Sequence, residues 1–253
     1  MFRVDYTPYK LLDWISLDQL DWENLSINPR AIQLLEKNIE KISWRYLSSN
    51  KNAIHLLEKY PEKIVWLWIS ENPNAMNLIE KNIDKIDWNG LSGNPNAIPL
   101  LKKNKEKINW WILSSNEGAI KLLKQNKDKI WWNMLSFNTN AMTLLEENKD
   151  KIDWSMLSGN HEAISLLENN PDKINWENLS ENINAIHLLK ENQDKICWKC
   201  LSGNPSIFEI DYSMIKNKID GYRVELIEKC FHPNRLKYYL NKFNYNITTD
   251  NYV

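Results

Sequence analysis

Hydrophobic and polar positions follow one pattern along most of the chain, with a period of 22 residues. In the stretch 72–82, apolar residues recur at helical spacing after an Asn-Pro pair. Asparagine before proline is typical of a helix start, because its side chain caps the helix and proline tolerates the first helical position. Asn82 suits the left-handed conformation in which many helices end. The pattern predicts a helix of about ten residues in each unit.

A second, shorter helix is predicted around a tryptophan that occurs once in each unit. In the eighth unit Asn175 occupies the capping position, and Ile174 and Leu179 have the spacing of a hydrophobic staple. Each unit is therefore predicted to be a helix–turn–helix pair, and no stretch alternates with the period of two expected for strands. The repeated tryptophans are Trp22, Trp44, Trp66, Trp88, Trp110, Trp132, Trp154, Trp176 and Trp198.

The repeat predicts an all-α fold, an α-solenoid of about nine 22-residue helix–turn–helix coils with atypical terminal caps. We expect an N-terminal cap over residues 1–20, the helical repeat array over 21–204, and a C-terminal helical cap with a frayed tail over 205–253. The cap is expected to contain helices at about 213–230 and from near Pro233. Coils stacked ~8–10 Å apart would extend on the order of 80 Å. Pro99 falls inside a predicted helix, where we expect a kink or a tightened first turn, and not a break.

Composition narrows the classes of function. The net charge of −1 gives no general attraction to nucleic acids or anionic membranes. The chain shows no signal peptide and no apolar run long enough to span a bilayer, which predicts a protein that is neither secreted nor in a membrane. Three cysteines in 253 residues indicate a reducing compartment.

Four positions of the repeat are nearly invariant, and each has a structural interpretation. The tryptophans are predicted to lie in the core between coils, and not to form an exposed row for stacking ligands. Serine four residues after each tryptophan and asparagine six residues after it are interpreted as turn residues, with the asparagine side chain capping a helix. A lysine nineteen residues after the tryptophan could follow a phosphate backbone, but an acidic residue precedes every one, so nucleic-acid binding is disfavoured. These lysines are Lys41, Lys63, Lys85, Lys107, Lys129, Lys151, Lys173 and Lys195.

The cysteines raise the question of a metal site. Cys197, Cys200, Cys230 and His232 include the ligand types of a Cys₃His zinc site. The spacing between the two halves is not diagnostic, and Cys200 occupies a position that is often apolar in other units. We therefore interpret these cysteines as buried packing residues and predict no metal and no cofactor.

Catalytic patterns are missing from the sequence. The four histidines have no paired nucleophile or carboxylate pattern nearby, and the six glycines do not form a phosphate-binding loop. We predict that the chain is not an enzyme.

An excess of aromatic residues in the middle units is not explained by the repeat. We predict that Trp68, Trp111, Trp131 and Phe137 form an exposed patch for a protein partner, with Tyr46 nearby. The alternative is additional packing between coils. Variable positions on the longer helices, such as Gln33, His55 and His187, would tune the binding surface.

The string Ile-Asp-Trp-x-x-Leu-Ser-x-Asn-Pro-Asn-Ala-Ile-x-Leu-Leu-Glu resembles the short helical repeats of proteins from large nucleocytoplasmic DNA viruses of protists. The resemblance covers roughly residues 9–206, and the segment 231–236 resembles a closing motif of such proteins. It implies no catalytic chemistry. We therefore predict a virus-encoded repeat scaffold that binds a viral or host protein in the host-cell cytoplasm or the virion. The alternative function is a nucleic-acid-binding or zinc-dependent module that uses the lysines and the C-terminal Cys and His residues.

Overall fold

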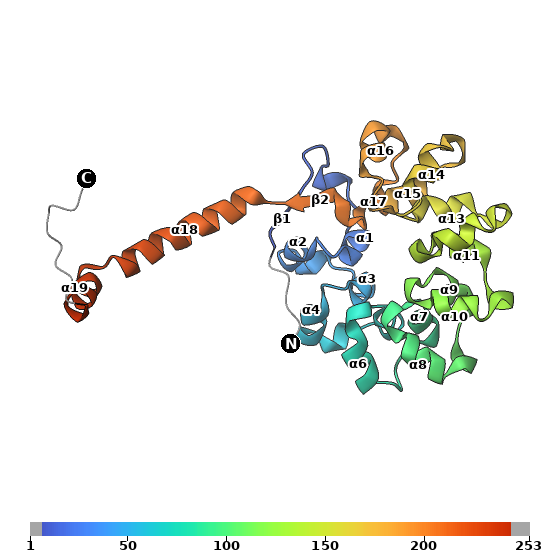
Figure 1. Cartoon of the computed structure of the whole chain (residues 1–253), viewed down its shortest axis with the longest axis horizontal. Helices are drawn as coiled ribbons and strands as arrows, with labels where there is room; N and C mark the ends of the chain where they lie inside the picture. Colours follow the sequence, from blue (N-terminus) through green and yellow to red (C-terminus); the bar gives the residue numbers. More distant parts are fainter. Residues whose placement is uncertain (1–6, 244–253) are drawn as a thin grey trace. The chain divides into compact units, whose positions relative to one another are not determined.

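The computed structural model of the protein describes residues 7–243. The chain forms two units, Met1–Glu209 and Ile210–Val253. In the first unit short helices follow one another in a regular series and each packs against its neighbours, which confirms the predicted all-α repeat fold (Figure 1). The strands β1 (Tyr9–Leu11) and β2 (Phe208–Ile210) form a small two-stranded sheet that the sequence pattern did not predict.

Each of the first eight coils contains an inner helix that starts at the repeated tryptophan and an outer helix (Figure 1). The ninth coil, all of it within the described residues, has an inner helix and a 3-10 turn but no outer α-helix. The inner helices are α1 (Trp22–Ile27), α3 (Trp44–Ser49), α5 (Trp66–Ile69), α7 (Trp88–Gly93), α9 (Trp110–Ser115), α11 (Trp132–Phe137), α13 (Trp154–Gly159), α15 (Trp176–Glu181) and α17 (Trp198–Ser202). The outer helices are α2 (Ile32–Glu36), α4 (Ile54–Lys59), α6 (Met76–Lys81), α8 (Ile98–Lys103), α10 (Ile120–Lys124), α12 (Met142–Glu146), α14 (Ile164–Glu168) and α16 (Ile186–Glu191).

The 3-10 turns occupy the links between these helices. They are η1 (Leu17–Gln19), η2 (Ile39–Lys41), η3 (Pro61–Lys63), η4 (Pro73–Ala75), η5 (Pro95–Ala97), η6 (Lys105–Lys107), η7 (Glu117–Ala119), η8 (Lys127–Lys129), η9 (Thr139–Ala141), η10 (Lys149–Lys151), η11 (Pro171–Lys173), η12 (Gln193–Lys195) and η13 (Pro205–Ile207). In coils 3 to 6 the predicted ten-residue helix is therefore a 3-10 turn followed by a short α-helix, as in η4 and α6.

Two local predictions at the outer helices need correction. Asn82 ends α6 with φ −134°, so it is not left-handed, and its Nδ2 instead donates to the Leu78 carbonyl oxygen at 2.9 Å. This bond satisfies one of the carbonyl groups that a helix end leaves without a partner. Pro99 is the second residue of α8, where the missing N–H would have no acceptor within the helix. The expected conflict at Pro99 therefore does not arise.

Leucine and alanine form the deepest part of the core, with the tryptophans packed against it. In the seventh coil Leu157, Ala163 and Leu167 are fully buried, and the equivalent positions are buried throughout the array. All nine repeated tryptophans are partly buried and pack against this core, so the predicted core role holds for one side of each ring. Continuous apolar contact between coils stabilises an array whose single units are too short to fold alone.

The repeated serines connect each coil to the next. Ser158 Oγ donates to the Trp154 carbonyl oxygen at 2.8 Å and accepts the Asn175 backbone N–H of the next coil at 2.9 Å. The same pair of bonds is made by Ser26, Ser48, Ser70, Ser92, Ser114, Ser136 and Ser180. Serine is therefore fixed by its own helix and by the start of the following inner helix.

The repeated asparagines reach back to the preceding coil. Asn160 is fully buried, and its Nδ2 donates to the carbonyl oxygens of Ser136 at 3.0 Å and Asn138 at 3.1 Å. Its Oδ1 accepts the Glu162 backbone N–H at 3.0 Å, which is the predicted cap. Buried amides of this kind are retained because each lost bond leaves a buried backbone group without a partner.

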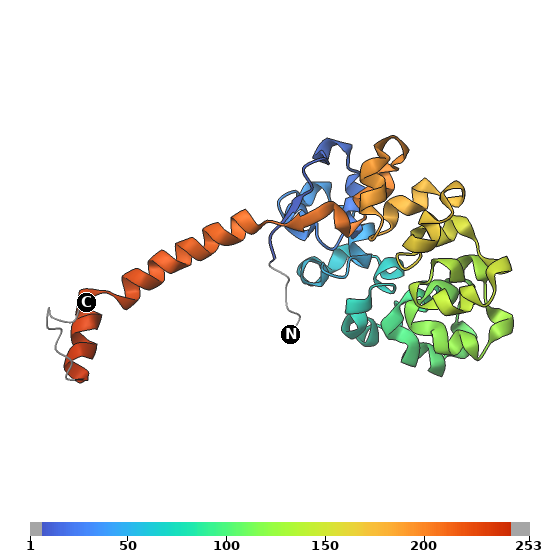
Figure 2. The ribbon, with the colours of Figure 1, turned by 45° about the horizontal axis from the view of Figure 1, so that its top comes forward.

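The array closes on itself, so the expected extension of about 80 Å is wrong. Helix α17 packs against α1 (Figures 1 and 2). Ser202 Oγ accepts the Asp21 backbone N–H at 2.8 Å, and Asn28 Nδ2 donates to the carbonyl oxygens of Ser202 and Asn204, each at 3.0 Å. These are the same bonds that join consecutive coils. The first coil thus occupies the place that a tenth coil would take, and the nine coils form a ring.

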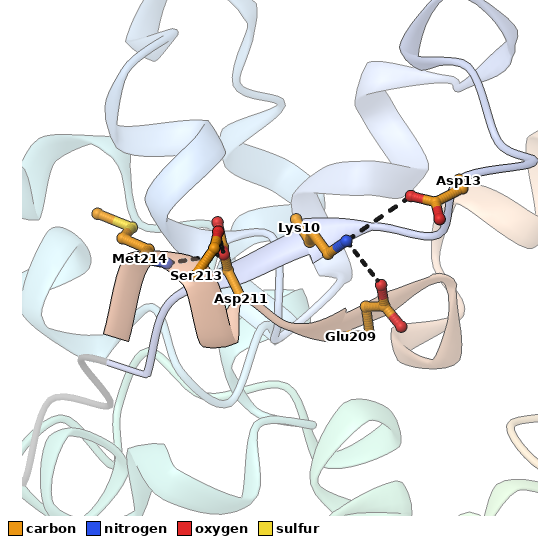
Figure 3. Close-up of polar contacts among 6 residues, drawn as sticks. All are labelled: Lys10, Asp13, Glu209, Asp211, Ser213 and Met214. Atoms are coloured by element: carbon orange, nitrogen blue, oxygen red, sulfur yellow. Dashed lines mark hydrogen bonds and ion pairs between the residues drawn. The ribbon is translucent and has the colours of Figure 1, made fainter. Parts of the chain in front are cut away.

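The N-terminal segment, residues 7–20, contacts both ends of the array at the ring closure. The Leu12 backbone N–H donates to the Ile207 carbonyl oxygen at 2.9 Å, and the rings of Trp14 and Trp198 lie 6.4 Å apart. Lys10 Nζ lies 3.0 Å from Glu209 and 3.6 Å from Asp13 (Figure 3). Residues 7–20 therefore lie against the ninth coil and join the two ends of the array.

The second unit contains α18 (Tyr212–Cys230) and α19 (Pro233–Lys242), close to the bounds predicted from the sequence. Asp211 caps α18 by accepting the Met214 backbone N–H at 2.9 Å and the Ser213 hydroxyl (Figure 3). The predicted frayed tail at 244–253 lies outside the described residues. Among residues 7–243, no helix combines the length and hydrophobicity needed to cross a membrane.

Candidate site on the inner face of the ring

The residue five positions after each tryptophan faces the interior of the ring. It is the residue between the repeated serine and asparagine. In coils 1 to 6 this position lines one cavity of about 540 Å³, through Ile27, Ser49, Glu71, Gly93, Ser115 and Phe137. The same cavity is lined by Trp111, Ile112 and Met134. Six coils contribute to it, so it exists only because the array curves into a ring.

A second cavity of about 350 Å³ lies beside Phe137. It is lined by Phe137 together with Asn24, Ile27, Tyr46, Glu181, Cys200 and Gly203. Phe137 belongs to the sixth coil and Ile27 to the first, so this side chain projects across the interior. Glycine at position 159 makes room for it, because a Cβ there would lie 2.5 Å from the Phe137 ring. The aromatic side chain and the small residue of the next coil therefore fit one another.

Three of the four residues predicted as the aromatic patch are exposed. Trp111 is 44% exposed, Trp131 53% and Phe137 38%. Trp111 and Phe137 line the same cavity. Trp131 is the capping residue of α11, where five of the other eight coils have Asp or Asn. We refer to Trp111, Trp131 and Phe137 as the aromatic face.

The repeat register places Trp131 beside Trp111. Asn109 and Asn89 occupy the equivalent two positions one coil earlier, and their side chains form a hydrogen bond of 2.8 Å. Because the coils repeat with no change of register, the residue that caps one inner helix lies next to the second residue of the preceding inner helix. Trp131 thus extends the aromatic lining of the cavity toward the cap of α11.

Trp68 differs from the other three residues. Its ring lies 5.3 Å from that of Tyr46, and the Arg45 guanidinium lies 4.8 Å above it. Trp68 is partly buried in these contacts. The alternative interpretation of the aromatic excess, as additional packing between coils, therefore describes Trp68 and Tyr46 better than it describes the aromatic face.

Acidic groups accompany the aromatic residues. Burial, together with the charge of Asp87, raises the pKa of Glu71 from 4.5 to about 7. Burial and the nearby Glu177 also raise the pKa of Glu181, which lines the second cavity. The interior of the ring thus holds carboxyl groups whose charged form is disfavoured unless a cation or a hydrogen-bond donor approaches.

The lysine positions have a role within the repeat. Lys107 Nζ lies 4.4 Å from the centre of the Trp88 ring, and Lys173 Nζ lies 4.2 Å from that of Trp154. Lys41, Lys85, Lys129, Lys151 and Lys195 make the same contact with the tryptophan of their own coil. These cation–π contacts cover the outer side of each partly buried ring. The regular spacing of the lysines therefore does not need a phosphate backbone to explain it.

The cysteines do not match the predicted packing role. Cys197 and Cys200 are only partly buried, and Cys230 is exposed in α18. Burial raises the pKa of the Cys200 thiol, and Cys197, Glu181 and Glu177 raise it further. The two thiols lie close to the Glu177 carboxylate, with all three ligand atoms within 4.8 Å of one another. Cys230 and His232 belong to the second unit.

The outer face carries grooves that belong to the repeat. One cavity of about 670 Å³ lies between α12 and α14 and is lined by residues such as Ile152, Trp154 and Lys173, which recur in most coils. The variable positions proposed to tune binding lie on the outer helices. There His55 and His187 contact Glu36 at 2.9 Å and Glu168 at 3.1 Å. These contacts join neighbouring outer helices.

Sequence reasoning identified the aromatic face but not the cavity that it lines. The signal was present, because a variable residue, often Gly or Ser, separates the invariant serine and asparagine. This variable residue lines a cavity only because the array closes into a ring. No protein-family model, no curated protein and no solved structure matches this chain.

Proposed function

We propose that this chain is a non-catalytic repeat scaffold that binds a protein partner, viral or host, on the inner side of its ring. The observation that carries the proposal is the exposure of Trp111 and Phe137, which line one cavity, together with the exposure of Trp131. Tryptophan and other large aromatic residues dominate the binding energy of protein interfaces. Exposed aromatic residues gathered at a concave surface are typical of binding sites.

The repeat itself does not require these aromatic residues. The position of Trp111 is Asn89 in the preceding coil, and that of Phe137 is Ser115. Those coils form the same inner helices with the same serine bonds. The aromatic side chains are therefore additions to a scaffold that folds without them, as expected for residues that serve binding.

The cavity chemistry favours a particular kind of partner segment. Ile27, Ile112 and Met134 make the lining apolar, while Glu71 and Glu117 add carboxyl groups. A segment with an apolar side chain next to a lysine or arginine would bury its apolar part against the aromatic face. Its cation would favour the charged form of Glu71.

Capture by cross-linking from infected host cells tests the proposal. The full chain is compared with the double variant Trp111→Ala, Phe137→Ala, and with Tyr222→Ala as a control, since Tyr222 is 68% exposed in the second unit. We expect one protein to be captured by the wild type and the control, with at least a tenfold loss in the double variant. Circular dichroism checks that the helical content of the double variant is unchanged.

Two outcomes would contradict the proposal. Undiminished capture by the double variant would show that the aromatic face is not the binding site. Binding of nucleic acid at low salt that is lost by roughly 200 mM would instead favour the alternative function.

A further inference from the structure

Two of the three cysteines of the chain lie together where the eighth coil meets the ninth. Cys197 is the capping residue of α17, and its Sγ accepts the Cys200 backbone N–H at 3.3 Å. Glu177 is the second residue of α15 in the preceding coil. Its carboxylate and the two Sγ atoms all lie within 4.8 Å of one another.

This juxtaposition follows from the repeat register. Glu177 and Cys197 hold the same two positions as Asn89 and Asn109, whose side chains bond at 2.8 Å. The capping residue and the residue three positions later also meet in other coils, as when Asp87 accepts the Gly90 N–H at 2.7 Å. The scaffold therefore brings any side chains at these three positions together, and only in this pair of coils are they Cys, Cys and Glu.

We propose that Cys197, Cys200 and Glu177 form a binding site for a thiophilic divalent cation, with zinc as the fitting ion. Two thiolates and a carboxylate are three of the ligand types that zinc prefers, and a water molecule completes four-coordination. In a tetrahedral zinc site with Zn–S of about 2.3 Å, two sulfurs lie about 3.8 Å apart. The three ligand atoms lie within 4.8 Å of one another, which is at most about 1 Å more than this value. Side-chain rotation can supply this difference.

The surroundings of the three ligands suit a cation. The carboxyl group of Glu181 lies near Glu177 and Cys200. Among residues 7–243, neither Glu177 nor Glu181 forms an ion pair. Zinc binds the thiolate form of cysteine. On binding zinc, each thiol gives its proton to solvent, so the site releases two protons per ion.

The position of the site gives it a structural consequence. A zinc ion held there joins α15 to α17, and α17 is the helix that packs against α1 at the ring closure. A ligand that binds only the folded protein raises its stability in proportion to its affinity. Zinc binding is therefore expected to stabilise the closed ring, independently of whether a protein partner occupies the inner face.

Titration of the reduced full chain with cobalt(II), followed by zinc, tests the site. We expect one equivalent of cobalt to give thiolate charge-transfer absorption and the visible bands of tetrahedral cobalt, which one equivalent of zinc removes. Cys197→Ser and Cys200→Ser should each weaken binding at least about tenfold, and Glu177→Gln should weaken it while retaining the thiolate absorption. The matched control is Cys230→Ser, which removes the exposed third thiol and should leave the titration unchanged.

A second readout is the thermal unfolding midpoint, which zinc should raise in the wild type and in Cys230→Ser but not in Cys197→Ser. Three results would overturn the proposal: no cobalt spectrum from the reduced, folded chain, a spectrum that survives Cys197→Ser, or zinc binding that depends on Cys230. Formation of a Cys197–Cys200 disulfide with no metal affinity in the reduced protein would also overturn it.

Discussion

Ring closure can be tested by one substitution made at two places. Asn72 lies inside the array, and its Nδ2 donates to two carbonyl oxygens of the preceding coil at 3.0 and 2.9 Å. Asn28 makes the equivalent bonds across the closure, to Ser202 and Asn204. Both asparagines are fully buried, and the Oδ1 of each caps the N–H two residues later. The variants Asn72→Ala and Asn28→Ala therefore remove the same set of bonds.

The expected magnitude follows from these bonds. Each buried group left without its partner costs about 1–3 kcal/mol, and the lost cap costs about 1 kcal/mol. We expect each variant to lower the free energy of unfolding by about 3–7 kcal/mol. If the array were open in solution, Asn28 would have no carbonyl partners across the closure. Asn28→Ala would then cost only the cap, about 1 kcal/mol.

Urea unfolding of the full chain, followed by circular dichroism, measures both variants against the wild type. For a closed ring, Asn28→Ala and Asn72→Ala are expected to lower the free energy of unfolding by amounts that agree within about 0.5 kcal/mol. A loss of about 1 kcal/mol at position 28 together with a loss above about 3 kcal/mol at position 72 would refute closure. If both variants lowered the free energy of unfolding only slightly, the structural role assigned to the buried Asn28 and Asn72 side chains would be refuted.

Three further predictions concern other contacts. Gly90→Ala should destabilise the protein by about 1–3 kcal/mol in urea unfolding, because a Cβ there would lie 2.5 Å from a backbone carbonyl oxygen of the preceding coil. Gly221→Ala, with no atom within 4 Å of the new Cβ, should instead strengthen α18 by about 0.5–1 kcal/mol. Lys107→Met should lower the free energy of unfolding by about 0.5–1 kcal/mol through loss of the Trp88 contact, and an unchanged thermal midpoint would contradict that role. Burial raises the pKa of Glu71 from 4.5 to about 7. The folded state therefore holds this proton more tightly, stability falls as pH rises through that interval, and Glu71→Gln should remove this part of the pH dependence.

The sequence was sufficient for the local structure because the relevant forces act within one or two units. The capping role of Asn175 follows from its position before α15 and is confirmed by its bond to the Asn178 N–H at 2.9 Å. The structural roles predicted for the repeated serines and asparagines are likewise confirmed, although their bonds to the neighbouring coil were not foreseen. The left-handed end expected at Asn82 was wrong because a side-chain amide satisfied the helix carbonyl group instead.

The period, the helices and the residue types of the core were determined by the sequence alone, since propensity, capping and apolar spacing are properties of short segments. Closure was decided by the tertiary structure, because it depends on the rotation from each coil to the next, about 40° for nine coils in a full turn. No single residue encodes that angle, which results from the packing of all inner and outer helices. Ring closure in turn placed Phe137 opposite Ile27 and turned a variable position of the repeat into the lining of a cavity.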